Sequence, residues 1–171
     1  MTTDQLEKQS QEVSNTKDLK PDLALKRLQP LVGTWKLEGH VVGSDEHNIN
    51  GTTRFQWLYK DEETGTGFYL QQDMEMDYAG KRIVAHELIG YNPETKAFSS
   101  YVYQNLAAEP WRYEWDMHGQ EWTISIKRGA IDSSFKGKMS PDGNSFTGGW
   151  RPNPGADESA NSSYDVKGTR I

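Results

Sequence analysis

The residues best suited to acid–base chemistry stand side by side in one apolar segment. His86 and Glu87 lie within the run from Ile83 to Ile89. Imidazole and carboxyl groups are common proton-transfer groups of enzymes, so either residue is a candidate general base in an enclosed site. Adjacent residues of a β-strand point to opposite faces, and at most one of the two can face an interior. Because a lone titratable group is more often structural, the sequence favours a hydrogen-bonded strand histidine and keeps both residues as candidate catalytic groups.

The sequence lacks the residue patterns of several well-known catalytic, metal and phosphate sites. The chain has no cysteine, which excludes disulfides, thiolate metal sites and thiol catalysis. The acidic stretches at 45–47 and 61–63 match no metal-ligand spacing. No glycine-rich phosphate loop opens a helix, and no serine stands in a nucleophile elbow. We therefore expect no metal ion, and neither a hydrolase nor a nucleotide-dependent enzyme.

The charge distribution limits the classes of partner. Acidic residues outnumber basic ones by 25 to 19, and the lysines and arginines are scattered. Such a surface offers no footprint for a phosphate backbone, so we expect no nucleic-acid partner. Residues 1–20 are polar and contain no apolar stretch of the kind that a signal peptide or membrane span needs. We expect a cytoplasmic protein that does not insert into a membrane, and a homodimer is left open.

The elements that would position these groups are mostly strands. Residues 1–20 are expected to form a disordered or loosely ordered arm, followed by one domain over 21–171. A short helix is predicted from Asp22 to Pro30, with Leu25 and Leu28 on one face. Runs with period-two alternation then follow, separated by turns rich in Gly, Pro, Asn and Asp. The predicted strands are 33–42, 50–59, 66–76, 82–91, 97–105, 111–117, 121–127, 133–139, 145–151 and 163–171.

The short links between these runs determine the fold class. They imply antiparallel neighbours, and no helical run is available for a parallel crossover. The sequence therefore predicts an all-β fold, a closed antiparallel meander β-barrel of about ten strands with the short N-terminal helix capping one end. Closure hides the sheet edges and leaves an interior wider than side chains alone fill. An internal cavity is the expected consequence.

The beginning of the barrel carries a recognisable motif. A short helix is followed by Gly-x-Trp on the first strand, in the residues Leu31-Val32-Gly33-Thr34-Trp35. This arrangement resembles the opening of lipocalins and their calycin relatives. The resemblance implies that Trp35 closes the bottom of the barrel and that Arg170, on the last strand, packs across it through a cation–π contact.

Further motifs extend this resemblance over about residues 21–171. They are Phe55-Gln56-Trp57-Leu58, His86-Glu87-Leu88-Ile89-Gly90-Tyr91-Asn92-Pro93-Glu94-Thr95, Tyr113-Glu114-Trp115 and Ser140-Pro141-Asp142-Gly143-Asn144. In these the chain resembles an uncharacterised, mostly bacterial family of lipocalin-like domains, and more distantly fatty-acid-binding proteins and nitrobindin-type barrels. The resemblance implies a fold and supplies no catalytic residues. The polar segment 151–161 looks longer than the usual link and is expected to flank a barrel mouth.

Haem is a cofactor of some barrels that resemble this one, where a histidine on a late strand is the axial ligand. Here no histidine follows His118. Leu37 also stands where the haem-binding barrels typically carry a glycine. The sequence therefore argues against haem, and no cofactor is expected.

Apolar strand faces predict the lining of the cavity. Alternation places apolar residues on one face of several strands, namely Phe68, Leu70, Met74 and Met76, then Trp111, Tyr113, Trp115 and Met117, and then Trp122, Ile124 and Ile126. The predicted ligand-binding residues are Trp57, Met74, His86, Tyr101, Tyr103, Tyr113 and Trp115. For the residues on apolar faces, a core position without ligand contact is the alternative. For Tyr101 and Tyr103 it is cross-strand aromatic packing, and for His86 a hydrogen-bonded strand histidine that faces solvent or a neighbouring tyrosine.

The predicted function is binding of a small hydrophobic or amphipathic molecule in the barrel cavity. The first alternative is an enzyme on the same barrel, an isomerase, cyclase or lyase in which His86 or Glu87 transfers a proton. The second is a partner-binding protein that uses the barrel rim and the arm and has no ligand. A completely filled interior would exclude both cavity hypotheses.

Overall fold

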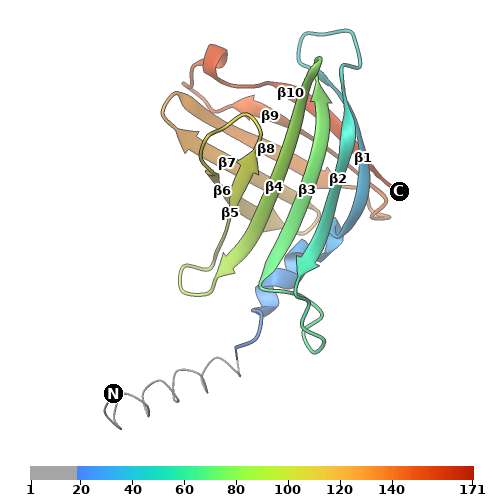
Figure 1. Ribbon diagram of the computed structural model, residues 1–171, viewed down its shortest axis with the longest axis vertical. Coiled ribbons are helices and arrows are strands. Elements are labelled where there is room, and N and C mark those ends of the chain that lie inside the picture. The colour runs from blue at the N-terminus through green and yellow to red at the C-terminus, as the bar shows by residue number, and fades with distance from the viewer. Residues whose placement is uncertain (1–18) are drawn as a thin grey trace.

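The computed structural model describes residues 19–171, and its ten strands close into one antiparallel barrel (Figure 1). Strand order in the sheet follows chain order, and the first strand pairs with the last. The predicted closed meander is confirmed. The elements are η1 (Leu23–Leu31), β1 (Gly33–Val41), β2 (Ile49–Leu58), β3 (Tyr69–Tyr78), β4 (Lys81–Asn92), β5 (Ala97–Gln104), β6 (Trp111–His118), β7 (Glu121–Arg128), β8 (Ile131–Met139), β9 (Ser145–Pro152), η2 (Glu158–Ala160) and β10 (Tyr164–Arg170).

The N-terminal arm predicted for 1–20 falls almost entirely on residues 1–18, which lie outside the described residues. Within residues 19–171, no helix is both long enough and apolar enough to span a bilayer.

The third strand begins three residues later than predicted. β3 starts at Tyr69 because the preceding residues form a hydrogen-bonded loop. The Asp61 carboxylate accepts hydrogen bonds from the backbone and the hydroxyl of Thr64, and the Asp61 backbone N–H donates to the carbonyl of Thr66. Phe68 consequently lies just before the strand with 45% of its surface exposed, and the prediction that it faces inward is wrong.

The predicted helix forms as a 3-10 helix that runs through Pro30 to Leu31 instead of ending at Pro30. A 3-10 helix has about three residues per turn, so leucines spaced three apart share one face. Leu25, Leu28 and Leu31 are all buried in the core at the lower end of the barrel (Figure 1). The Asp22 carboxylate caps the helix by accepting the backbone N–H of Ala24 at 2.7 Å. This helix therefore plugs one end of the barrel.

The seam between the first and last strands is held by a tryptophan and an arginine. Trp35 of β1 is fully buried, and its indole N–H donates to the carbonyl of Leu31 at 2.8 Å. The guanidinium carbon of Arg170, paired with Trp35 across the β1–β10 seam, lies 4.1 Å from the ring centre. Arg170 also donates to the carbonyls of Val32 at 2.6 Å and Pro30 at 3.1 Å. The expected cation–π contact is confirmed, and it joins the seam to the helical plug.

We predict that Arg170→Met lowers the free energy of unfolding by about 2–3 kcal/mol, because it removes the cation–π contact and charge-assisted hydrogen bonds to backbone carbonyls. Urea unfolding followed by tryptophan fluorescence measures the change. Lys167→Met, on the exposed face of the same strand, is the matched control and should stay within about 0.5 kcal/mol of the parent protein. Equal stability of the two variants would contradict a structural role for Arg170.

Candidate functional site

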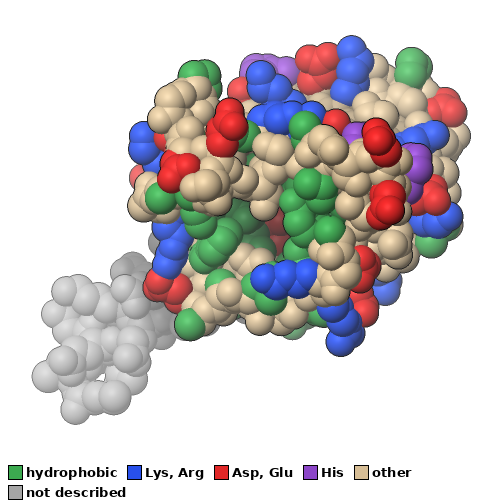
Figure 2. Space-filling model, turned by 90° about the horizontal axis from the view of Figure 1, so that it is seen from above, with side chains coloured by type: hydrophobic (Ala, Val, Ile, Leu, Met, Phe, Trp, Pro, Cys, Tyr) green, Lys and Arg blue, Asp and Glu red, His purple; other side chains and the backbone are tan. Residues whose placement is uncertain are grey.

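The barrel encloses a cavity of about 380 Å³. Leu31 of the helical plug lines its floor, whereas Lys81 and residues 160–162 line it at the opposite end, where the β3–β4 turn and the β9–β10 link lie. Seen from that end, the molecule has a hollow bordered by hydrophobic side chains (Figure 2). The polar segment 151–161 thus contributes to the mouth of the barrel, as expected. The cavity is closed at the plug and accessible from the other end.

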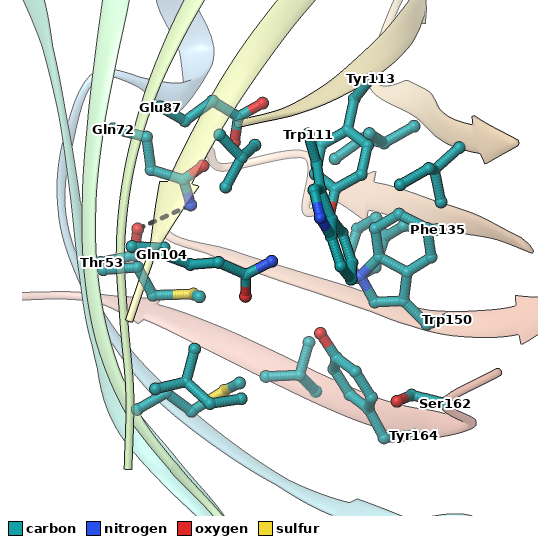
Figure 3. Close-up of a pocket in the computed structure, with 18 of the residues that line it drawn as sticks. Thr53, Gln72, Glu87, Gln104, Trp111, Tyr113, Phe135, Trp150, Ser162 and Tyr164 are labelled. Carbon is teal, nitrogen blue, oxygen red and sulfur yellow. Dashed lines mark hydrogen bonds between the residues drawn. The ribbon is translucent and has the colours of Figure 1, made fainter. Parts of the chain in front are cut away.

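The two sides of the cavity differ in chemistry (Figure 3). On one side, polar side chains project from neighbouring strands β2, β3, β4 and β5; they are Thr53, Gln72, Glu87 and Gln104. On the other side, aromatic rings project from β6, β8, β9 and β10; they are Trp111, Tyr113, Phe135, Trp150 and Tyr164. Some of these rings contact one another, with the Trp150 ring centre 5.7 Å from that of Tyr113 and 5.9 Å from that of Phe135. The cavity therefore has a polar wall and an aromatic wall.

Close packing against glycine keeps two further rings flat on the barrel wall. The Trp122 ring lies against Gly137, its cross-strand partner on β8, and the Phe146 ring lies against Gly168, its partner on β10. A Cβ atom at either glycine would collide with the ring beside it. The rings therefore cover the backbone of neighbouring strands instead of filling the centre of the barrel, which leaves volume for the cavity.

Glu87 places a carboxyl group in the polar wall. Only 6% of its surface is exposed. The indole N–H of Trp115 lies 3.1 Å from Glu87 Oε1 and 3.0 Å from the hydroxyl oxygen of Ser100, so both oxygens share this donor. Burial raises the pKa of Glu87 from its ordinary value of 4.5 to about 7, and hydrogen bonds involving Ser100 and Trp115 oppose part of that rise. The group can therefore hold or release a proton near neutral pH.

The orientation of the Gln72 amide follows from its neighbours. The Thr53 hydroxyl donates its proton to the backbone carbonyl of Asp73 at 3.3 Å, so it acts as an acceptor toward Gln72. Gln72 Nε2 donates to Thr53 Oγ1 at 2.9 Å, which leaves the amide oxygen on the cavity side (Figure 3). The Gln104 side-chain amide also lies in this wall and offers a further donor and acceptor to the cavity. The polar wall thus has unused hydrogen-bonding capacity.

Two tyrosines on the aromatic wall are partly buried, Tyr113 and Tyr164. Burial raises the pKa of Tyr113 above its ordinary value, and the charge of Glu87 raises it further. Burial likewise raises the pKa of Tyr164, with added effects of Tyr113 and Tyr78. Both phenols therefore stay protonated at neutral pH and contribute neutral hydroxyl groups to the cavity.

Three of the predicted lining residues face the outside. His86 projects outward, with Nδ1 2.7 Å from Asp73 Oδ1, and Tyr101 and Tyr103 are 50% and 52% exposed. The inward face of β5 instead carries Ser100 and Val102, both buried. The small Ser100 side chain leaves room for the Trp115 indole. The prediction that these three residues face the cavity is therefore wrong, and of the His86–Glu87 pair Glu87 is the inward member.

The other predicted residues divide between the plug and the cavity. Trp57 lies at the plug, where its indole N–H donates to Gln29 Oε1 at 2.8 Å, and it does not line the cavity. Met74, Tyr113 and Trp115 do line the cavity. Their role as ligand contacts remains a prediction.

The sequence-based prediction did not include several residues that line the cavity. They are Thr53, Gln104, Trp150 and Tyr164. Trp150 follows two glycines on β9, where alternation is hard to recognise. The sequence did contain a signal for Gln72 as a cavity residue, because it is a polar residue on the apolar face of β3 that includes Leu70 and Met74.

Most of the chain matches a known protein family. A family model described as a protein of unknown function, DUF1579, matches residues 20–141. The matched part includes the plug, β1 to β8 and therefore Glu87, whereas β9 and β10 follow it. A comparison with curated proteins gives no match. Within the described part of the chain, no three His, Asp or Glu side chains gather in a way that could hold a metal ion.

We predict that Glu87 makes stability fall as pH rises from about 4.5 to about 7. In this interval the folded protein keeps the Glu87 proton whereas the unfolded chain releases it, so the folded state binds more protons and loses up to about 3 kcal/mol. Urea unfolding across this range should show the parent protein losing stability relative to Glu87→Gln, with the difference constant above about pH 7.5. Parallel pH profiles for the two proteins would contradict a raised pKa of Glu87.

Proposed function

The chain belongs to DUF1579, a family of proteins of unknown function, and we propose that it binds a small hydrophobic or amphipathic molecule inside its barrel. The observation that carries this proposal is the cavity of about 380 Å³, enclosed by the barrel and accessible at one end. Small-molecule sites typically combine such a concave apolar surface with a few polar groups that orient the ligand. Here the aromatic wall supplies the apolar surface and the polar wall supplies the orienting groups.

The architecture supports placing this barrel among the lipocalin-like, calycin-type proteins. The ten-strand meander, the helical plug and the contact between Trp35 and Arg170 are all consistent with that assignment. A lipid would be a ligand of the proposed class, and the cysteine-free chain suits a cytoplasmic location. We therefore propose a lipid-like ligand and a cytoplasmic location.

The cavity residues have separate roles in this proposal. Met74, Tyr113 and Trp115 are the predicted contact residues that lie on the wall. Aromatic side chains bury large apolar areas and stack on flat ligands, so Trp111 and Trp150 would contribute most of the binding energy. The polar wall would determine the orientation of the ligand.

A second candidate function is proton transfer on an enclosed substrate, as in an isomerase, cyclase or lyase. Glu87 favours it, because a buried carboxyl group with a pKa of about 7 is populated in both protonation states at neutral pH. Such a group would take a proton from a substrate carbon and return it at another position. His86 is on the outer face and would take no part.

We predict that Ala85→Trp prevents an apolar probe from binding. Ala85 lines the cavity, and an indole there would occupy much of its volume. The affinity for 1-aminoanthracene, measured by its fluorescence, should fall at least about tenfold. Val84→Trp, at the adjacent residue on the outer face, is the matched control and should bind like the parent protein.

Circular dichroism would first establish that both variants are folded. The proposal fails if the folded parent protein does not bind the probe. It also fails if folded Ala85→Trp binds the probe as tightly as the parent protein, because the probe would then lie outside the barrel.

For the second function, we predict that the protein accelerates the elimination of 5-nitrobenzisoxazole. A carboxylate removes the ring C–H proton, the N–O bond breaks, and the released nitrophenolate is measured by absorbance. The rate should increase with pH through about pH 7 as Glu87 ionises, and Glu87→Gln should lower it at least about tenfold. His86→Gln is the matched control and should retain the parent rate. Equal rates for the parent protein and Glu87→Gln would exclude Glu87 as the base.

A further inference from the structure

The cavity wall has few charged side chains, and they lie at different depths. Among the described residues that line it, only Glu87 and Lys81 have charged side chains. Lys81 is the first residue of β4 and is exposed at the mouth. Glu87 is buried in the polar wall. The enclosed part of the cavity therefore contains a carboxyl group and no cation from the described residues.

This arrangement opposes a ligand that carries a carboxylate into the barrel. The ligand anion would be removed from water without a positive partner, which is unfavourable in an apolar interior. It would also meet the carboxyl group of Glu87, and like charges at close range disfavour ionisation of both. A fatty acid inserted with its carboxylate first does not suit this cavity.

The free hydrogen-bond acceptors of the polar wall favour a ligand that donates hydrogen bonds. Gln72 and Glu87 are direct cross-strand partners on β3 and β4, and both side chains face the cavity (Figure 3). Gln72 donates its amide N–H to Thr53 and leaves its oxygen as an acceptor. Glu87 Oε1 accepts from Trp115, and the carboxyl group keeps capacity at Oε2. Two neighbouring acceptors on one wall suit a ligand that donates hydrogen bonds.

We propose that the bound molecule is an apolar amine or alcohol whose polar group donates hydrogen bonds to Glu87 and Gln72. This inference rests on the proposed ligand-binding function. A protonated amine would form an ion pair with the Glu87 carboxylate inside the barrel, and aromatic faces across the cavity would attract the same cation. A hydroxyl group would donate to the same two acceptors without a charge.

Three probes of equal chain length test the proposal: octylamine, octan-1-ol and octanoate. Each is titrated against bound 1-aminoanthracene at about pH 8, where Glu87 is ionised. Octylamine should displace the reporter at a concentration at least about tenfold lower than octanoate requires, and octan-1-ol should lie between them. In Glu87→Gln the difference between octylamine and octanoate should shrink to within about threefold. His86→Gln, with its change on the outer face of the same strand, should keep the parent order.

The outcomes separate this inference from the proposed function. If folded parent protein does not bind 1-aminoanthracene, both fail. If the reporter binds but octanoate displaces it as well as octylamine does, only the inference about the polar group is overturned. The same holds if the preference for octylamine persists unchanged in Glu87→Gln, because the selectivity would then come from another part of the protein.

Discussion

Pairing of β1 with β10 closes the sheet, and the helical plug, the cavity and the buried carboxyl group are all arranged around that closure. In a closed ring of strands every strand has a hydrogen-bonded neighbour on both sides, so the sheet has no free edge strand. The seam is held where Trp35 and Arg170 meet, and Arg170 also binds carbonyls at the end of the helical plug. One arginine therefore joins the first strand, the last strand and the plug. Because Arg170 holds the plug against the seam, this end of the barrel is closed.

A closed ten-strand barrel has an interior that its side chains do not fill completely, and local packing decides the shape of the remaining volume. Trp122 and Phe146 lie against glycines on neighbouring strands, so these large rings cover the wall and leave the centre open. The same enclosure buries Glu87 and raises its pKa to about 7. Cavity, aromatic wall and unusual carboxyl group are thus consequences of one closed sheet.

The strand pattern was predictable because alternation and turn residues are local signals, and the links between strands are too short for any arrangement except a meander. The inward face of β5 was not predictable in the same way. The large side chains of Tyr101 and Tyr103 favoured the prediction that their face of β5 points into the barrel. In the structure Ser100 points inward instead, because the Trp115 indole from the next strand occupies the space beside it. Alternation likewise showed that His86 and Glu87 point in opposite directions, but which one faces inward depends on contacts with other strands.

A crystal structure of the protein grown with 1-aminoanthracene would show directly whether the barrel encloses a ligand. We predict electron density for the probe inside the barrel, between Trp111 and Trp150 on one side and Gln72 on the other, with its amine within hydrogen-bonding distance of Glu87. An interior filled by the protein's own side chains, with the probe on the outer surface or absent, would contradict the claim that this barrel encloses a ligand site.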